Sequence, residues 1–383
     1  MDASTGTGGV KLTLARVTAL RLPLREPLAT ARGPVITREG ALLEIEADGA
    51  CGWGEALPLA GFGLEAADTA ANALVAACRR LVGVEIFDPG EALAASSSDL
   101  ANAPAARAAL DTAWRDLSAR AAGLTLAAQL AAARQATARA SVETGALIAG
   151  ATPDDAARDA EAALAAGYRT LKLKLGRDEF ERDLAHVAAV RSVAALVPLR
   201  LDANGSWSES EAARHIDALA AFDPELLEQP VVFDAVDAMA RLRELAAFPL
   251  AADEAVRSPS SAQRLLDAGA ADVLILKPAA IGGPGASIAI ASAARKARVD
   301  VLVTSFLDSA IGRSAALHVA ASLPPAAYAA GLATGRLLAD DLATIGDPVA
   351  GTLFVASGAG LGVTPEAGTI ARLATAPSWE LRA

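Results

Sequence analysis

Eight short apolar runs recur between Ser141 and Thr334, and this rhythm constrains the fold more than any other feature of the chain. Ala-rich stretches of helical character separate the runs, which repeat roughly every 25 to 30 residues. The runs are SVETGALI (141–148), RTLKLKLG (169–176), PLRLDANG (198–205), PELLEQP (224–230), FPLAADEA (248–255), ADVLILKP (271–278), VDVLVTSF (299–306) and, more weakly, AYAAGLAT (327–334). Eight strand–helix units predict a (β/α)8 barrel.

A doubly wound open sheet would also alternate strands with helices. That fold commonly opens a helix with G-x-G-x-x-G after its first strand, and no such motif stands there. The GTGG at 6–9 and the GGPG at 282–285 lie in the wrong context to serve as a phosphate cradle. The barrel is therefore the favoured α/β architecture.

The first third of the chain has a different pattern. In residues 11–48, strand-like alternation of apolar and polar residues flanks a turn segment that contains Gly and Pro. This pattern predicts a small antiparallel sheet. A Gly-rich stretch, GACGWGEALPLAGFG (49–63), then leads into Ala- and Leu-rich helical sequence over residues 65–133, broken near Pro89 and Pro104. Sheet followed by helices predicts a separate α+β unit.

Composition excludes several classes of function. The chain has 34 Lys and Arg against 45 Asp and Glu, for a formal charge of −11, and so lacks the basic footprint of a nucleic-acid-binding protein. The longest uncharged stretch, 314–335, contains His318 and two prolines, and we predict no membrane partner. Residues 1–10 do not resemble a secretory signal, and two cysteines imply neither a disulfide framework nor a Cys-based zinc site, so a cytoplasmic location is expected.

Three carboxylates stand at the ends of three successive runs. Asp202, Glu228 and Asp253 are spaced by 26 and 25 residues, and the carboxyl ends of barrel strands converge on one rim. Three oxygen ligands at one rim would suit a divalent ion that keeps positions open for substrate, which favours Mg²⁺. Alternatively, each carboxylate could cap the helix that follows it.

Lysine is rare in this chain, with five lysines among the 34 basic residues, and three of the five stand in strand-like runs. Lys172 and Lys174 are two residues apart, so their side chains point to the same face of a strand, and Lys277 ends the sixth run. Two buried ammonium groups need carboxylates or an anionic substrate opposite them, or one of them gives up its proton and becomes a base. The alternative is that these lysines are exposed and protect a sheet edge.

Lysines facing a Mg²⁺ site describe the abstraction of a proton α to a carboxylate. The metal would neutralise charge on the carboxylate oxygens while a lysine takes the proton. No nucleophile or phosphate cradle indicates hydrolysis or phosphoryl transfer.

The motifs KLK (172–174), LDANGSW (201–207), LEQP (227–230), ADE (252–254) and LKP (276–278) resemble those of the enolase superfamily in its muconate lactonizing branch. The resemblance runs from about Leu12 to the end of the chain and implies a modified (β/α)7β TIM-type barrel over 136–349. It also implies an α+β capping domain over 1–135, which residues 350–383 rejoin. The mandelate racemase branch is disfavoured, because it places a His–Asp pair beyond the sixth strand, where Lys277 stands.

The resemblance also implies roles for single residues. Asp202, Glu228 and Asp253 would ligate Mg²⁺, for which Mn²⁺ could substitute, with Asn204 and Glu254 supporting them. Lys174 would be the acid/base on one face of the substrate and Lys277 its counterpart on the other, while Lys172 would lower the pKa of Lys174.

Within the branch, the segments GWGEALPLAGFG (52–63), TSFLDSAIGRSAALHVAASLP (304–324) and GLATGRLLADDLA (331–343) resemble those of o-succinylbenzoate synthases. Ala60 replaces an expected Pro, and Asp308 stands where Glu is more usual. Dipeptide epimerases carry a D-x-D on the eighth strand for the substrate's ammonium group, where this chain has Gly331 and Ala333. The synthase reading implies dehydration of a cyclohexadiene carboxylate to o-succinylbenzoate in menaquinone or phylloquinone biosynthesis.

Two further readings remain open: racemisation or epimerisation of N-succinylamino acids or dipeptides by the two lysines, and a barrel that binds without catalysis. The expected partner is a small carboxylate substrate, and a homo-oligomer is compatible with the sequence. Candidate substrate contacts are Arg25, Arg32, Phe62, Ser305, Asp308 and Gly331.

Overall fold

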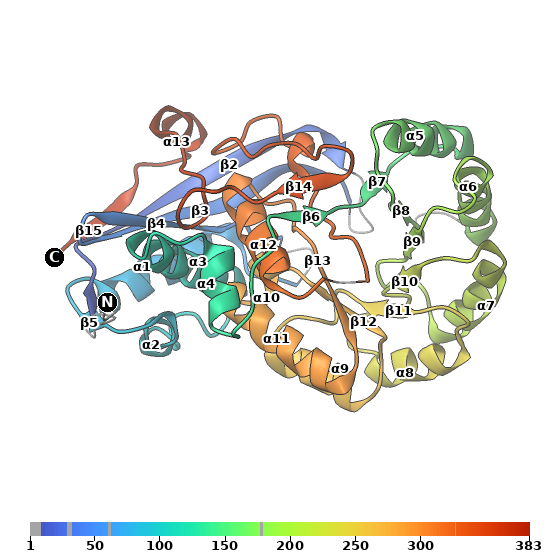
Figure 1. Ribbon diagram of the computed structural model, residues 1–383, viewed down its shortest axis with the longest axis horizontal. Helices are drawn as coiled ribbons and strands as arrows, with labels where there is room; N and C mark the ends of the chain where they lie inside the picture. Colours follow the sequence, from blue (N-terminus) through green and yellow to red (C-terminus); the bar gives the residue numbers. More distant parts are fainter. Residues whose placement is uncertain (1–8, 29–32, 60–62, 177–178, 326) are drawn as a thin grey trace.

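The computed structural model describes residues 9–28, 33–59, 63–176, 179–325 and 327–383. Figure 1 shows a curled parallel sheet with helices along its outer side, next to a layer of long antiparallel strands and helices from the N-terminal third. This arrangement confirms the predicted barrel with its N-terminal α+β cap.

The cap is built on a four-stranded sheet. Strands β2 (Leu14–Leu28), β3 (Val35–Ala47) and β4 (Ala50–Ala56) form an antiparallel meander, and β15 (Trp379–Arg382) from the chain's C-terminus pairs with β2. A short pair, β1 (Val10–Lys11) with β5 (Glu85–Ile86), lies beside it. The cap helices are α1 (Ala67–Leu81), α2 (Pro89–Ala95), α3 (Pro104–Ala121) and α4 (Leu126–Ala132).

The two prolines that interrupt the helical sequence each begin a helix. Pro89 and Pro104 occupy the first turns of α2 and α3, where no intrahelical N–H bond is lost. Helix α3 then lies directly on β4. A Cβ at Gly52 or Gly54 would meet the backbone oxygens of Ala113 and Ala109 at 2.2 and 1.9 Å, so the glycines of the GWG segment permit this close packing.

Seven parallel strands form the barrel sheet, in the order β13-β12-β11-β10-β9-β8-β7. They are β7 (Ala146–Ile148), β8 (Leu171–Lys174), β9 (Leu199–Asp202), β10 (Leu226–Glu228), β11 (Leu250–Ala252), β12 (Val273–Leu276) and β13 (Asp300–Val303). The outer helices are α5 (Pro153–Ala165), α6 (Phe180–Val193), α7 (Glu209–Leu219), α8 (Val236–Leu245), α9 (Pro259–Asp267), α10 (Pro278–Ile281), α11 (Pro284–Ala297) and α12 (Ala310–Ser322).

The first and last of the eight predicted runs depart from regular strands. The run 141–148 divides into β6 (Ser141–Glu143), which pairs with β14 (Thr352–Phe354), and β7, which joins the barrel. The run 327–334 contributes only the isolated bridges Thr144 to Ala330 and Thr304 to Gly331. Its Ala and Gly residues supply little apolar surface for a strand, which agrees with the weaker pattern of this run in the sequence.

After the barrel the chain forms the 3₁₀ helix η3 (Gly335–Leu337), then β14, α13 (Ala367–Leu373) and β15. Another 3₁₀ helix, η2 (Ala220–Phe222), follows α7 within the barrel. The C-terminal residues thereby pair with the N-terminal sheet. Because β15 covers the edge of β2, the ends of the chain hold the cap together.

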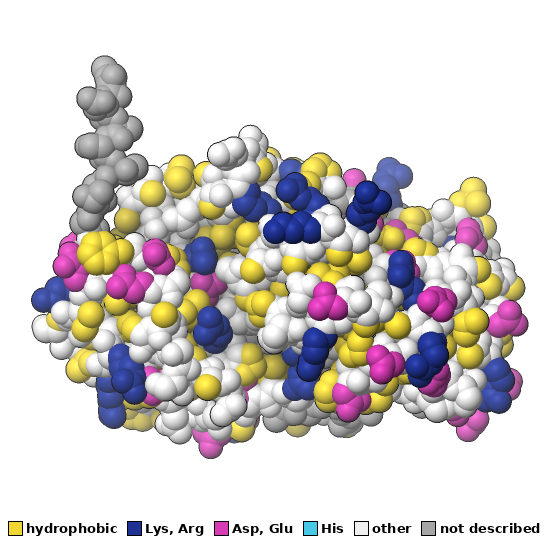
Figure 2. All heavy atoms as spheres, turned by 90° about the horizontal axis from the view of Figure 1, so that it is seen from below, with side chains coloured by type: hydrophobic (Ala, Val, Ile, Leu, Met, Phe, Trp, Pro, Cys, Tyr) yellow, Lys and Arg dark blue, Asp and Glu magenta, His cyan; other side chains and the backbone are white. Residues whose placement is uncertain are grey.

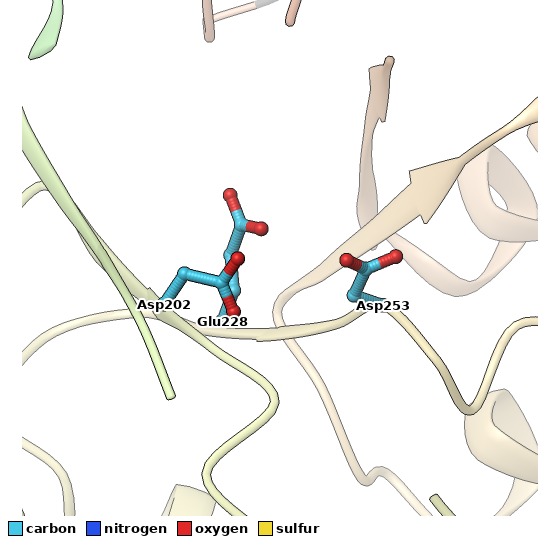
Figure 3. Close-up of side chains that lie close together, drawn as sticks. All are labelled: Asp202, Glu228 and Asp253. Carbon is cyan, nitrogen blue, oxygen red and sulfur yellow. The ribbon is translucent and has the colours of Figure 1, made fainter. Parts of the chain in front are cut away.

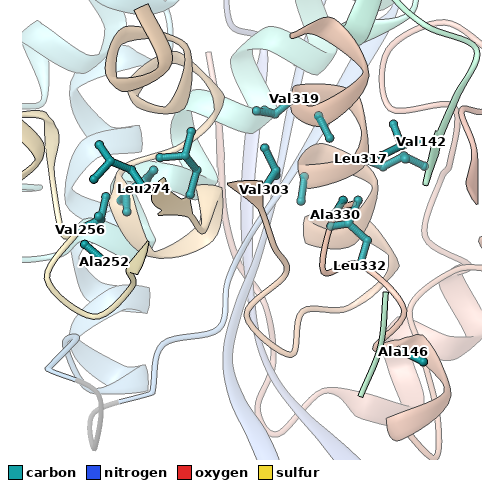
Figure 4. Packing of buried hydrophobic residues seen from close by; sticks show 14 of the residues in the cluster. Val142, Ala146, Ala252, Val256, Leu274, Val303, Leu317, Val319, Ala330 and Leu332 are labelled. Carbon is teal, nitrogen blue, oxygen red and sulfur yellow. The ribbon is translucent and has the colours of Figure 1, made fainter. Parts of the chain in front are cut away.

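Apolar packing unites the two parts. One buried cluster extends from cap residues such as Leu22 and Trp53 through the barrel strands and outer helices, and Figure 4 shows part of it around Val303, Leu317 and Ala330. A second cluster fills the space between the cap sheet and its helices. The surface in Figure 2 carries acidic and basic side chains interspersed among apolar and neutral ones. Among the described residues, no helix is long and apolar enough to span a bilayer.

Candidate active site

Three carboxylates meet at the carboxyl ends of β9, β10 and β11. Asp202 and Glu228 are the last residues of their strands and Asp253 directly follows the third, and all three are buried. One oxygen from each lies within 4.8 Å of the others, and Figure 3 shows the three side chains on the same side of the chain segments that carry them. The three carboxylates that the sequence places at the ends of successive strands therefore lie close together in space.

Lys172 and Lys174 project from β8, which lies between β7 and β9 in the sheet. Lys172 Nζ forms an ion pair with Glu228 and lies 2.9 Å from Asp202 Oδ2. Burial lowers the pKa of Lys172, but the surrounding carboxylates outweigh it and hold that pKa above its ordinary value. Lys172 is thus a partly buried cation within the carboxylate cluster.

Lys277 follows β12 and approaches the cluster from the other side. Its Nζ donates to Asp253 Oδ2 at 2.7 Å, and it lies 5.4 Å from the ring centre of Phe306. Burial lowers the pKa of Lys277, yet Asp253 and Glu254 raise it beyond that effect. In the sheet, β9, β10 and β11 lie between β8 and β12, so the carboxylates separate Lys174 from Lys277.

Asn204 and Glu254 connect the carboxylates to Lys174. Asn204 Nδ2 donates to Asp202 Oδ2 at 3.3 Å and to Glu254 Oε1 at 3.0 Å, while its Oδ1 accepts from Lys174 Nζ at 3.1 Å. The residue adopts a φ of 47°, in the left-handed region that Asn tolerates. Burial, together with the charge of Asp253, raises the pKa of Glu254 to about 7.

The two structural alternatives for these residues are wrong. Helices α7 and α9 are capped by Ser208 and Ser258, and α8 has no side-chain cap, so the carboxylates are not helix caps. The lysines do not protect a sheet edge, because β8 and β12 are both interior strands of the barrel sheet.

The donor set fits a hard divalent ion. It consists of oxygens from three buried carboxylates, the ligand type that Mg²⁺ prefers. Among the described residues, the buried Glu254 Oε2 has no hydrogen-bond partner, whereas Asp253 Oδ1 is ion-paired with Lys277 Nζ at 2.7 Å. Glu254 Oε2 therefore retains its lone pairs in the cluster.

The predicted substrate contacts are less closely gathered. Asp308 and Ser305 follow β13 on the loop that carries Phe306. Asp308 Oδ2 accepts from Phe306 N at 2.7 Å, and Ser305 Oγ lies 2.7 Å from Thr334 Oγ1. Both side chains are buried.

Gly331 and Arg25 lie at two other places. Gly331 bridges to Thr304 beyond the end of β13, whereas Arg25 is exposed and its Nε donates to Arg336 O at 3.1 Å. Arg32 and Phe62 lie outside the described residues. The structure thus joins the lysines and carboxylates into one network and leaves Arg25 beyond that network.

Three further residues build this site without having been predicted to do so. Gln229 follows Glu228 with a φ of 39°, and its Oε1 accepts from Asp253 N and Ala255 N at 3.0 and 3.2 Å. Arg38, fully buried on β3, donates to the carbonyls of Leu57, Pro58, Phe306 and Leu307. Glu55 on β4 accepts from Ser309 N at 3.0 Å.

The sequence does not single out Arg38. Its strand parity on β3 is shared by Leu42 but also by Glu44 and Glu46, so alternation alone does not predict a buried face. Gln229 stands in the LEQP motif, but its contacts with Asp253 and Ala255 depend on the turn after β10.

Comparison with known proteins agrees with this geometry. Residues 13–131 match the N-terminal domain of the mandelate racemase / muconate lactonizing enzymes, and residues 155–368 match the enolase C-terminal domain-like family. The chain is 31% identical over 325 residues to the L-Ala-D/L-Glu epimerase of Bacillus subtilis (strain 168), covering 82% of this chain and 86% of that protein.

Two other relatives carry different activities. The o-succinylbenzoate synthase of Mycobacterium ulcerans (strain Agy99) is 43% identical over 191 residues, which is 49% of this chain and 56% of the synthase. The crystal structure of a dipeptide epimerase from Enterococcus faecalis V583, complexed with Mg and the dipeptide L-Leu-L-Tyr, superposes with a TM-score of 0.86 at 28% identity, covering 92% of this chain and 99% of that one. With both of its domains matched, this chain belongs to the enolase superfamily, among the mandelate racemase / muconate lactonizing enzymes.

Proposed function

We propose that this chain abstracts the α-proton of a carboxylate substrate and dehydrates it to o-succinylbenzoate, the hydro-lyase reaction of menaquinone and phylloquinone biosynthesis. The observation that carries the proton-transfer chemistry is the placement of Lys174 and Lys277 on either side of three buried carboxylates. The regional identity of 43% to a synthase supports the specific reaction.

Gly331 supports the synthase over a dipeptide epimerase. A dipeptide presents an ammonium group that needs a carboxylate partner, and the positions where epimerases of this superfamily carry acids hold Gly331 and Ala333 here. A Cβ at 331 would lie 2.8 Å from Thr304 Cγ2, so a larger residue does not fit without movement. This region is therefore suited to a substrate without a cation at that end.

The reaction begins when Lys174 Nζ takes the α-proton and the C–H electron pair moves onto the substrate carboxylate. Asp202 and Glu228 hold Lys172 in its charged form. Because a second positive charge on Lys174, two residues away on the same strand, would be repelled by Lys172, the neutral form of Lys174 is favoured. The electron pair then expels the ring hydroxyl, which takes the proton back from Lys174 Nζ and leaves as water, and the ring becomes aromatic. Lys277 keeps its proton and places positive charge near the anionic substrate.

Asp202, Glu228 and Asp253 would hold the metal, with Asn204 fixing the orientation of Asp202. Bound Mg²⁺ supplies positive charge against the carboxylate oxygens on which negative charge develops. Chelation with EDTA should therefore abolish turnover, and Mg²⁺ should restore it. We expect Mn²⁺ to restore it as well, because it accepts the same oxygen ligands.

The second candidate is racemisation of N-succinylamino acids. These substrates lack the free ammonium group of a dipeptide, so Gly331 does not disfavour them. Lys174 and Lys277, separated by the carboxylate cluster, would remove and return the proton on opposite faces.

One experiment separates these readings. Purified protein with Mg²⁺ is incubated in deuterium oxide with the cyclohexadiene substrate, N-succinylamino acids and dipeptides, each in a separate reaction. The synthase should release an aromatic product that absorbs in the ultraviolet, whereas a racemase should place deuterium on the α-carbon of both enantiomers. Exchange on a dipeptide without aromatic product would overturn the proposal, and binding without any turnover would indicate a non-catalytic barrel.

A further inference from the structure

The barrel sheet is open at its amino end between β13 and β6. In the described part of the segment that should close it, Gly331 bridges to Thr304 just after β13, and Ala330 bridges to Thr144 between β6 and β7, but no continuous strand forms. A cavity of about 920 Å³ lies between β6 and β13, on the amino-terminal side of those two bridges. It is lined by β13, β6, the last turn of α12 and part of α11. The carboxylate cluster lies at the other end of the strands.

Four arginines line this cavity: Arg134, Arg139, Arg295 and Arg298. Two acids, Glu143 and Asp300, also line it, so the lining carries an excess of positive charge in a chain whose net charge is −11. Among the described residues, none of the four guanidinium groups lies within ion-pair distance of a carboxylate, unlike Arg241 and Arg372 on other outer surfaces.

Part of this arginine cluster has a structural use. Arg134 donates to the carbonyls of Leu130 and Ser322, and Arg139 Nη2 donates to Ala320 O at 2.7 Å, so both cap the last carbonyls of neighbouring helices. That use is incomplete, because Arg139 Nε is buried without a hydrogen-bond partner. Arg295 and Arg298 are exposed, and their guanidinium groups donate no hydrogen bond among the described residues.

Like charges do not gather without a compensating partner. Burial, and then the charge of Arg295, lower the pKa of Arg134, whereas for Arg139 burial lowers the pKa and the charge of Glu143 opposes that effect. The remainder of the lining is apolar, including Leu302, Leu323 and part of Tyr328. A guanidinium cluster beside an apolar wall is complementary to an anion that carries an apolar body.

We propose that the cavity between β13 and β6 is a second binding site, for a small organic anion with a phosphate or carboxylate head and an apolar body. The head would contact Arg295 and Arg298 at the opening and the unpartnered Nε of Arg139 deeper in, while the body would lie against Leu302 and Leu323. The site does not depend on the reaction catalysed at the other end of the barrel.

The test is isothermal titration calorimetry on the full chain at low ionic strength, with EDTA present. The probes are phenyl phosphate, inorganic phosphate and phenol, which separate the head from the body. Phenyl phosphate should bind one to one and at least tenfold more tightly than either of the others, and added salt should weaken it. The double variant Arg295→Gln with Arg298→Gln should lose at least tenfold in affinity.

Two matched variants complete the test. Arg264→Gln, on exposed α9 outside the cavity lining, should bind phenyl phosphate like the parent protein. Lys277→Ala should also bind it unchanged, because Lys277 lies at the other end of the barrel. Binding that survives the double arginine variant, or that disappears in Lys277→Ala, would overturn the proposal.

Self-association is the competing use of an arginine-lined face. Sedimentation velocity on the same proteins decides it. If the parent chain binds none of the probes and the double variant changes its oligomeric state, the cavity belongs to an interface between copies and the proposal is wrong.

Discussion

Lys174, the base that we propose, is one of the chain's rare lysines. The chain has five lysines among 34 basic residues, so arginine is its usual cation. A guanidinium cannot give up its proton near neutral pH, whereas an ammonium with a lowered pKa can. For the proposed base Lys174, arginine would therefore not serve, while Lys296 is an exposed residue on α11.

Replacing the proposed base should stop the reaction without unfolding the chain. We expect Lys174→Ala to lower kcat at least 100-fold, a typical loss for a general base, because Lys172 and Lys277 remain engaged with carboxylates. The product's ultraviolet absorbance measures the rate, and far-ultraviolet circular dichroism checks the fold. Lys296→Ala is the control and should leave the rate unchanged; a Lys174→Ala protein with the parent rate would refute the mechanism.

The close packing of Gly331 against Thr304 predicts that a larger residue at position 331 destabilises the barrel closure. The Gly331→Ala variant should lose about 1–3 kcal/mol of unfolding free energy, the usual cost of an extra methyl group in a packed region, because its Cβ meets Thr304 Cγ2. Urea denaturation measures this loss. Thr304→Ser removes that methyl group, so the double variant should recover part of the stability, and additive losses would contradict the proposed contact.

At the scale of elements, α12 joins three parts of the chain through a buried histidine. His318 Nδ1 accepts from Ala127 N on α4 at 3.0 Å, and its Nε2 lies 3.0 Å from Leu361 O in the C-terminal segment. These partners assign a neutral ring with its proton on Nε2. Burial lowers the pKa of His318 to about 4, because a charged imidazole would have no room for solvation there.

That lowered pKa makes stability depend on pH in a defined window. The unfolded chain binds a proton at His318 near pH 6.5 and the folded chain only near pH 4, so stability is full above pH 6.5 and is lost as the pH falls toward 4. From pH 7 to pH 5 this residue should remove about 2 kcal/mol of unfolding free energy. His318→Gln, which keeps one donor and one acceptor, lacks this contribution, so by urea denaturation the parent protein should lose about 2 kcal/mol relative to the variant between pH 7 and pH 5.

Ser314→Ala is the matched control for that experiment. Its hydroxyl donates to the same Leu361 carbonyl at 2.7 Å but does not titrate. The variant should therefore lose about 1 kcal/mol equally at pH 5 and pH 7. A His318→Gln protein with the parent's pH dependence would assign that dependence to another group.

For the whole molecule, the cap and the barrel meet through buried polar side chains as well as apolar packing. Arg38 on β3 donates to carbonyls of the loop after β13, and Glu55 on β4 accepts from Ser309, the N-cap residue of α12. The Phe306 ring lies near both Arg38 and Lys277, at 5.6 and 5.4 Å. The cap therefore positions the loop that contacts Lys277.

Glu55 provides a measurable signature of this interface. Burial and the nearby Asp308 raise the pKa of Glu55 to about 8, so the folded protein keeps the carboxyl protonated at pH values where the unfolded chain is ionised. Its effect on stability is therefore absent below pH 4.5 and grows unfavourable as the pH rises to 8. As the pH rises from 4.5 to 8, the unfolding free energy of Glu55→Gln, measured by urea denaturation, should increase relative to that of the parent protein. Above pH 8 the difference between the two proteins should stay constant. A constant difference across the range would contradict the raised pKa.

The amino-acid sequence determined the barrel, the cap and the identity of the chemical groups. Strand periodicity and the parity of Lys172 and Lys174 are properties of single segments, and the spacing of Asp202, Glu228 and Asp253 can be read along the chain. The ends of parallel strands then had to meet at one rim. The predicted Mg²⁺ chemistry follows from those residue types.

Only the tertiary structure decided what lies between segments distant in the chain. The closure at Gly331, the reach of Gln229 to Asp253 and the burial of Arg38 against the loop after β13 depend on how separate elements pack. Periodicity describes which face of an element is buried but not which atoms it will meet. The open seam with its four arginines arises in the same way, because a gap between strands has no pattern in any one of them.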